Sequence, residues 1–185
     1  VEHCREEAAR LLGVHHPERI LFTANCTEAL NLAISGTLRR GDEVICSYAE
    51  HNAVMRLLDR YVSRGGITVH MLAPDERGIL SPASLRRVIS RKTALVIIAH
   101  ASNVTGLIAQ LGAVCRERGV PLLVDAAQTA GMADVSPDVL CADMVAMPGH
   151  KGLLGPQGTG LLVLGYGMNP EPLLLGGTGS MSESV

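Results

Sequence analysis

A lysine, Lys151, lies in the glycine-rich segment MPGHKGLLGPQGTG, which runs from Met147 to Gly160 between two apolar stretches. Lysine is usually solvated, whereas glycines let a backbone approach a bound ligand closely. We therefore interpret Lys151 as a residue that acts on a ligand. The alternative interpretation is a lysine that is merely exposed at the surface.

Lys151 is one of several polar residues that follow apolar segments of the chain. These segments are 19–23, 43–47, 93–99, 121–125 and 143–147, and the residues at or after their ends are Thr27, His51, Asn103, Asp125 with Gln128, and His150 with Lys151. Ligands of open α/β sheets bind beyond the carboxyl ends of the strands. We therefore predict that these residues meet at a single ligand site.

Each of these residues also has a structural explanation. Thr27 could cap a helix, although the two roles are compatible because a helix N-terminus also binds phosphate. His51 could be an ordinary loop histidine, and Asn103 could be a turn residue before Gly106. Asp125 is the hardest to explain in this way, because a carboxylate at the end of the apolar segment PLLV needs a partner.

The elements that must position these residues alternate along the chain. Strand candidates lie at 19–23, 43–47, 68–72, 93–99, 121–125, 143–147 and 160–164, and helix candidates lie at about 2–12, 27–38, 52–64, 82–90, 107–118 and 126–131. Continuous apolar strands between helices predict an α/β fold of three layers (α/β/α) with a mostly parallel sheet. The last strand follows its predecessor without a helix, so it can run antiparallel and make the sheet mixed.

Composition narrows the classes of function. The chain has 185 residues, of which 47% are hydrophobic and 18% charged, and its net charge is −2, so we expect one globular domain with no nucleic acid or membrane partner. Its longest apolar segment, ALVIIA at 94–99, is much shorter than the roughly 20 residues of a membrane span. The P-loop pattern is absent, and no dinucleotide fingerprint follows the first strand, which argues against a nucleotide-binding domain.

The cysteines and the chain ends lead to two further predictions, on the redox state of the thiols and on the extent of the protein. Cys4, Cys26, Cys46, Cys115 and Cys141 are widely spaced and contain no CxxC pair. This pattern predicts reduced thiols in a cytoplasmic protein, with neither a disulfide framework nor a metal site. The chain does not begin with Met and ends in the polar segment GGTGSMSESV, so we expect it to be a piece of a longer protein.

Six segments occur in an order and a spacing that resemble a known family. They are FTANCTEALNLAI, EHNAVMRLL, HASNVTG, VDAAQTAG, HKGLLGPQGTG and GGTGS. Together they extend over nearly the whole chain and resemble the class V aminotransferases, most of all their cysteine desulfurase branch. The resemblance implies a fold type I enzyme that uses pyridoxal 5′-phosphate (PLP), with Lys151 forming the Schiff base. Such a bond needs a neutral amine, which partial desolvation and nearby positive charge favour.

The resemblance also implies which residues contact the PLP ring. Asp125 matches the aspartate that pairs with the pyridine nitrogen and keeps it protonated, so that the ring can accept electrons. Gln128 and Asn103 match residues near the ring hydroxyl oxygen. His51 matches the histidine that stacks on the ring and assists proton transfer.

The phosphate of PLP is assigned by the same resemblance to the backbone at Cys26, to Thr27 and to His150. Thr178, in GGTGS, resembles a threonine that reaches the phosphate of the partner subunit, which implies a homodimer. Pro148 departs from the family, which usually has Ser or Thr there to bind phosphate. Because proline supplies neither a hydroxyl nor a backbone N–H, we expect one phosphate contact to be lost.

Relative to the family, the sequence lacks an N-terminal segment and the C-terminal small domain. The resemblance therefore identifies residues 1–185 as an incomplete PLP-binding large domain. In the family, the small domain carries the arginine that binds the substrate carboxylate and, in desulfurases, the nucleophilic cysteine. None of the five cysteines of this chain matches that cysteine.

Three hypotheses for function follow. The leading one is a cysteine desulfurase that converts L-cysteine to L-alanine, leaves the sulfur as an enzyme persulfide and passes it to a sulfur-acceptor protein. The second keeps PLP but changes the reaction to that of an aminotransferase, a selenocysteine lyase or an epimerase. The third is a non-catalytic PLP-binding fragment, which Pro148 and the missing arginine motivate.

Overall fold

The computed structural model of the protein describes residues 1–74, 76, 79–100 and 105–176. Its helices are α1 (Glu2–Leu12), the 3-10 turn η1 (Pro17–Arg19), α2 (Cys26–Thr37), α3 (Asn52–Ser63), α4 (Pro82–Val88), α5 (Thr105–Arg118) and α6 (Pro137–Leu140). Its strands are β1 (Ile20–Thr23), β2 (Glu43–Ser47), β3 (Thr68–Leu72), β4 (Thr93–Ala99), β5 (Leu122–Asp125), β6 (Met144–Pro148) and β7 (Gly160–Leu164). Each predicted strand is present, with its ends within one residue of those expected.

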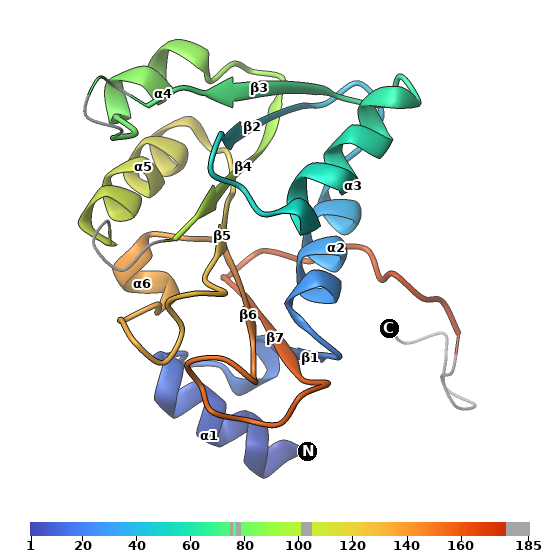
Figure 1. Ribbon diagram of the computed structural model, residues 1–185, viewed down its shortest axis with the longest axis vertical. Coiled ribbons are helices and arrows are strands. Elements are labelled where there is room, and N and C mark those ends of the chain that lie inside the picture. Colours follow the sequence, from blue (N-terminus) through green and yellow to red (C-terminus); the bar gives the residue numbers. More distant parts are fainter. Residues whose placement is uncertain (75, 77–78, 101–104, 177–185) are drawn as a thin grey trace.

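The strands form one 7-stranded sheet in the order β1-β7-β6-β5-β4-β2-β3 (Figure 1). β2 pairs in parallel with β3 and β4, and the parallel pairing continues from β4 through β5 to β6. β7 pairs antiparallel with both β6 and β1. β7 therefore runs against the other strands, and the prediction of a mostly parallel, mixed sheet is confirmed.

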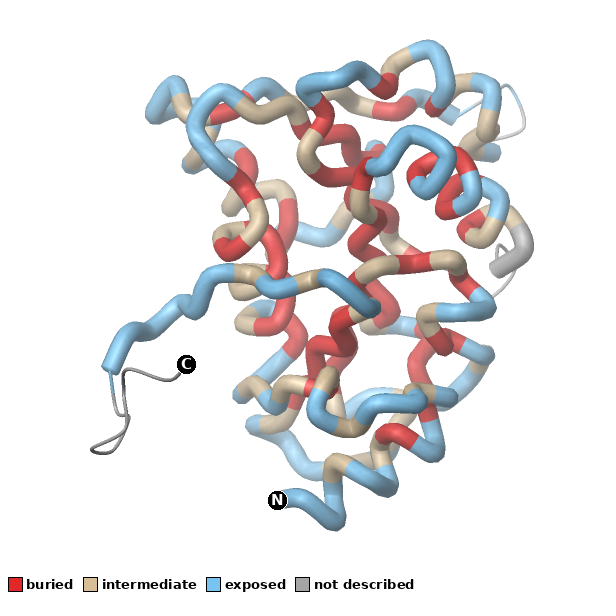
Figure 2. The backbone as a smooth tube through the Cα atoms, turned by 180° about the vertical axis from the view of Figure 1, so that it is seen from behind, coloured by how far each residue is buried: buried red, intermediate tan, exposed pale blue. Residues whose placement is uncertain are grey.

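Helices cover both faces of the sheet because its strands are apolar on both sides. On one face Leu111 of α5 belongs to the same buried cluster as Val96 of β4, together with residues of α1, α4 and α6. On the other face Ile34 of α2 clusters with Ile97 and with residues of α3. Successive side chains of a strand point to opposite faces, which is why neighbours in β4 join different clusters. Figure 2 shows the buried segments between exposed outer segments. Because helices pack on both faces of the sheet, the predicted α/β/α layers are confirmed.

The segment after β5 differs from the predicted helix at 126–131. The N–H of Ala130 donates to the carbonyl oxygen of Ala126 at 3.0 Å, and the N–H of Ala133 donates to that of Thr129 at 2.9 Å. Gly131, with a φ of 83°, connects these two turns, and a regular α-helix does not contain this left-handed conformation. The short helix α6 then follows at a place where none was predicted.

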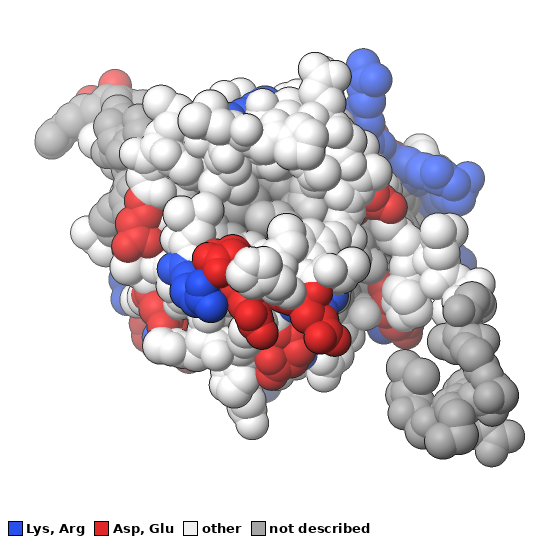
Figure 3. Space-filling model, turned by 90° about the horizontal axis from the view of Figure 1, so that it is seen from below, with Lys and Arg blue, Asp and Glu red and all other residues white. Residues whose placement is uncertain are grey.

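None of the helices in the described ranges is long and apolar enough to cross a membrane. On the lower end of the molecule, where α1 lies, most of the surface belongs to uncharged residues, and near its middle Asp and Glu cover more of it than Lys and Arg do (Figure 3). Glu2, Glu6 and Glu7 of α1 are exposed, whereas Ala9 and Leu12 are buried. α1 therefore packs its apolar side against the sheet and turns its acidic side outward.

Candidate active site

The carboxyl ends of five strands surround one cavity of about 540 Å³. The loops after β1, β2, β4, β5 and β6 all contribute to its wall. Its polar lining residues are Asn25, Cys26, Thr27, Glu50, His51, Asn52, His100, Asp125, Gln128, His150 and Lys151. This is the place at which open α/β sheets bind their ligands.

Asp125, at the end of β5, is buried beside the cavity, with 5% of its surface exposed. Its Oδ1 accepts hydrogen bonds from the backbone N–H of Ala127 at 2.9 Å and from the thiol of Cys26 at 3.7 Å. Its Oδ2 has no hydrogen-bond partner in the described part of the chain. Oδ2 is therefore available to accept a hydrogen bond from a ligand in the cavity.

Two charged groups of the cavity shift the thiol pKa of Cys26, the first residue of α2. Burial raises the pKa of its thiol well above the usual range, and the neighbouring Asp125 carboxylate raises it further. The Lys151 ammonium acts in the opposite direction and lowers this thiol pKa. Asp125 and Lys151 therefore both lie close to Cys26, which remains a protonated thiol.

The start of α2 forms another part of the cavity wall. Asn25 caps the helix, because its Oδ1 accepts the N–H of Glu28 at 2.9 Å, while Oε2 of Glu28 accepts the N–H of Ala24 at 2.6 Å. The structural alternative in which Thr27 is the cap is wrong, since Thr27 lies in the first turn. The first N–H groups of a helix have no intrahelical acceptor, so Cys26 and Thr27 offer theirs to an anion.

We call residues 149–159, which join β6 to β7, the lysine loop; it carries His150 and Lys151, both exposed. Two glycines let this loop approach the turn after β5. A Cβ on Gly152 would lie 2.3 Å from the carbonyl oxygen of Ala130, and one on Gly131 would lie 2.2 Å from that of Gly152. No other residue type fits such contacts, so this pair of glycines sets the position of Lys151 relative to the end of β5.

His51 ends the loop after β2 and caps α3. Its Nδ1 accepts the backbone N–H of Ala53 at 3.1 Å. With Nδ1 acting as an acceptor, the neutral ring carries its proton on Nε2. The ring is exposed and lines the cavity, so Nε2 can exchange protons with a bound molecule.

Two titratable residues that the sequence analysis did not select also line the cavity. Oε1 of Glu50 accepts from the Ser47 hydroxyl at 2.5 Å and from the N–H of Ala99 at 2.9 Å, and burial raises the pKa of Glu50 to about 7. His100 is 3% exposed, its Nδ1 lies 2.8 Å from the Thr129 hydroxyl oxygen, and burial lowers its pKa. Both residues follow strands, so the positional signal that selected their neighbours could have found them too.

The structure brings most of the predicted site residues together. Those that line the cavity are Cys26, Thr27, His51, Asp125, Gln128, His150 and Lys151. Their individual roles toward a cofactor stay predictions. Asn103 and Thr178 lie outside the described residues. Pro148, which ends β6, is also part of the wall.

Comparison with known proteins gives the relationships of the chain. The family model described as aminotransferase class V matches residues 1–185. A probable cysteine desulfurase from Methanothermobacter thermautotrophicus is 35% identical over 187 residues, which cover 96% of this chain and 45% of that protein.

Solved structures show the same relationship. The apo structure of a cysteine desulfurase from Thermococcus onnurineus NA1 has a TM-score of 0.84 and 32% identity, over 95% of this chain and 46% of that chain. The structure of SspA in complex with cysteine has a TM-score of 0.84 and 31% identity, over 95% of this chain and 52% of that chain. The chain thus spans about half the length of these relatives. From the family match over residues 1–185 and the relative at 35% identity, the chain belongs to the class V aminotransferase family.

Proposed function

We propose that residues 1–185 form a PLP-binding large domain that acts in a cysteine desulfurase, an enzyme that converts L-cysteine to L-alanine and a persulfide. The observation that carries the proposal is the unpaired Oδ2 of Asp125 beside a cavity that also contains Lys151 and the start of α2. A buried acceptor, an amine and an anion site correspond to the ring nitrogen, the aldehyde and the phosphate of PLP.

When bound, PLP supplies an aldehyde that condenses with amines and a protonated ring that accepts electrons. Asp125 would keep the ring nitrogen protonated by accepting its N–H hydrogen bond at Oδ2. Lys151 would supply the amine that anchors the cofactor, and its Nζ would hold or move a proton of the substrate. His51 holds a second proton at Nε2 and assists this transfer.

The phosphate is proposed to bind at the start of α2, where Cys26 and Thr27 present backbone N–H groups, with His150 as a further contact. Gln128, which is exposed in the cavity, is assigned to the ring oxygen. Pro148 lies in the same wall and has neither a hydroxyl nor an N–H to offer. The phosphate is therefore held by fewer donors than a Ser or Thr at this position would allow.

The relatives support L-cysteine as the substrate. Two of them are named cysteine desulfurases, and SspA was solved in complex with cysteine. Cys26 is the one thiol among the described cavity-lining residues, and its raised pKa keeps it protonated. We infer that the persulfide forms on a cysteine other than Cys26 and that a sulfur-acceptor protein takes the sulfur from it.

The proposal includes a homodimer in the cytoplasm. Leu174 and Leu175 are 84% and 88% exposed, and large exposed apolar side chains that are adjacent favour contact with another protein surface. We assign that surface to a second copy of the chain. All five cysteines are free thiols, which suits a reducing compartment.

The test is the reaction of the purified full-length protein with L-cysteine in the presence of PLP. With an added thiol reductant such as dithiothreitol, which reduces the persulfide, we expect alanine and sulfide to be released, and Lys151→Ala to lower the rate by roughly a thousandfold or more. Lys92→Ala, at an exposed lysine before β4, is the matched control and should keep wild-type activity. Keto acid production without sulfide would favour the aminotransferase alternative, and PLP binding without any turnover would favour the non-catalytic one.

A further inference from the structure

Glu50 precedes His51, and its carboxyl group joins two neighbouring strands. Oε1 accepts from the hydroxyl of Ser47, at the end of β2, at 2.5 Å, and from the N–H of Ala99, at the end of β4, at 2.9 Å. β2 and β4 are adjacent in the sheet. A single oxygen therefore ties the loop that carries His51 to the carboxyl end of β4.

The other oxygen of Glu50, Oε2, is buried and has no hydrogen-bond partner in the described ranges. Buried polar atoms are rarely left unpaired, and an unpaired one is most costly when its group is charged. A proton on Oε2 removes that charge. Burial is also the largest influence on the pKa of Glu50, which it raises to about 7 against the effect of the two hydrogen bonds.

Asp125, the other acidic residue that lines the cavity, has different surroundings. Its Oδ1 accepts two hydrogen bonds, and the Asp125 carboxylate raises the pKa of Glu50. Two carboxyl groups in one site disfavour each other's negative charge. Glu50, whose Oε2 is buried without a partner in the described ranges, is the one that burial favours as the neutral acid.

We propose that Glu50 is a positioning residue of the cavity, which as a neutral acid holds the His51 loop against β4. The inference rests on the proposed function, because the molecule whose charge matters is PLP. The phosphate dianion of PLP is disfavoured by a second negative charge in the cavity. PLP therefore binds better to the protein in which Glu50 is protonated.

Other ionisable groups surround the same cavity, and the experiment separates them from Glu50. They are Cys26, His51, His100, Asp125, His150 and Lys151. The wild type and the Glu50 variants share all of them, so a comparison at each pH isolates the contribution of Glu50. Glu50→Gln stays neutral and keeps an acceptor for both hydrogen bonds, whereas Glu50→Ala removes both bonds.

The first measurement is urea unfolding of the protein without PLP as a function of pH. The folded protein binds the Glu50 proton more tightly than the unfolded chain, with a pKa near 7 against the ordinary 4.5. The stability that this proton contributes is complete below the unfolded value and is lost as the pH rises through the folded value. The urea midpoint of the wild type should therefore fall below that of Glu50→Gln between these two pH values. Glu117→Gln, which removes an exposed carboxylate paired with Arg86, controls for a change in net charge.

The second measurement is the dissociation constant of PLP, followed by visible absorbance from about pH 6 to pH 8.5. The ratio of the wild-type constant to the Glu50→Gln constant should rise from near one to roughly five to ten, as expected for one added and partly screened charge. Glu50→Ala should bind PLP weakly at every pH. If Glu50→Ala does not fold, the variant Ser47→Ala is used in its place, because it removes one of the two hydrogen-bond donors to Glu50.

A constant ratio near one, or a Glu50→Gln protein that binds as weakly as Glu50→Ala, would overturn the inference. So would a wild-type urea midpoint that does not fall relative to Glu50→Gln as the pH rises. If the folded wild type binds no PLP at any pH, the proposed function fails instead. In that case the unfolding measurement, which uses no PLP, still decides whether Glu50 is the neutral acid.

Discussion

Asp125 and Lys151 carry the opposite charges of the cavity, and the structure holds them differently. Asp125 is buried at the end of a strand, and two donors fix its Oδ1. Lys151 lies exposed on the lysine loop, near enough to lower the pKa of Cys26. A fixed acceptor and an accessible amine suit a cofactor that is held by its ring and exchanged at its aldehyde.

The buried thiols are expected to resist alkylation. Burial raises the pKa of Cys46 and Cys115 to about 12, and it also raises that of Cys26. The thiolate is the reactive form, so iodoacetamide at about pH 8 should label the exposed Cys4 before these three. Peptide mass mapping over time measures the order. Early labelling of Cys26 would contradict the prediction that its thiol is protonated and unreactive, and it would make Cys26 a candidate sulfur acceptor.

Pro148→Ser is expected to tighten PLP binding. The substitution adds a hydroxyl and a backbone N–H to the cavity wall, and one hydrogen bond to a charged group contributes about 1.5 kcal/mol or more, which is roughly tenfold in the dissociation constant. Absorbance titration with PLP measures the change. Pro74→Ser, at an exposed proline after β3, should bind PLP like the wild type. Equal affinities of Pro148→Ser and wild type would place the phosphate away from this residue.

At the scale of elements, the contact between the lysine loop and the turn after β5 decides the geometry of the site. Gly152→Ala would bring a Cβ to 2.3 Å from the carbonyl oxygen of Ala130, so the two segments must separate. We expect a loss of about 1–3 kcal/mol in the free energy of unfolding, together with PLP binding weakened by roughly tenfold or more. Urea unfolding and absorbance titration measure the two effects.

Gly158→Ala provides a control in the same loop. A Cβ there has nothing within 4 Å, so the substitution costs only the strain of a φ of 78°, about 1 kcal/mol. Its PLP affinity should stay close to that of the wild type. If Gly152→Ala also binds PLP normally, the packing of this loop does not position Lys151.

The strands could be predicted from the sequence because each is a short apolar segment with its own signal. From these strands it could also be predicted that Asp125 and Lys151 lie at one site, since the carboxyl ends of parallel strands share one edge of a sheet. The turn at 126–131 could not be predicted in this way, because it depends on the close contact of Gly131 with the backbone of Gly152, which is distant in the sequence. Glu50 follows β2, so its position could have selected it, but its hydrogen bond from the N–H of Ala99 could not have been predicted because Ala99 belongs to another strand.

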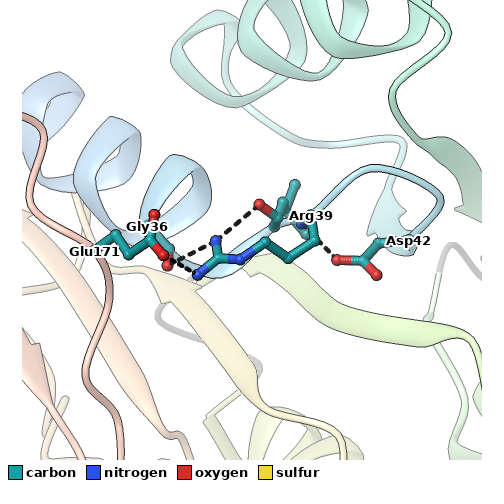
Figure 4. Close-up of polar contacts among 5 residues, drawn as sticks. Gly36, Arg39, Asp42 and Glu171 are labelled. Atoms are coloured by element: carbon teal, nitrogen blue, oxygen red, sulfur yellow. Dashed lines mark hydrogen bonds and ion pairs between the residues drawn. The ribbon is translucent and has the colours of Figure 1, made fainter.

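At the scale of the whole molecule, the end of the described chain is tied back across α2 (Figure 4). The N–H of Glu171 donates to the carbonyl oxygen of Gly36 at 3.0 Å, and the Arg39 guanidinium donates to Oε1 of Glu171 at 2.6 Å. Beyond this tie, Figure 1 shows the chain leaving the body of the molecule, with Leu174 and Leu175 exposed. The tie therefore fixes the direction in which this segment leaves α2, which bears on the proposed contact with a second copy.

Gly36→Ala is expected to release this segment without weakening α2. The new Cβ would lie 2.5 Å from the carbonyl oxygen of Glu171 and 2.6 Å from Cβ of Pro170, whereas alanine improves helix propensity by about 1 kcal/mol. Limited proteolysis around residue 170 should become faster, and sedimentation should show fewer dimers. Arg39→Ala removes one exposed ion pair and should have the smaller effect. An unchanged dimer in Gly36→Ala would argue against this segment as the dimer contact.

Reductive trapping tests whether Lys151 anchors PLP, as proposed. PLP is added to the purified protein, the visible absorption is recorded before and after borohydride reduction, and the peptides are mapped by mass. We expect a reducible band and a pyridoxyl group on the peptide that contains Lys151. Lys92 is the only other lysine of the chain, so it provides the internal control. A pyridoxyl group on Lys92, or a folded protein with no reducible band even as Pro148→Ser, would contradict the claim.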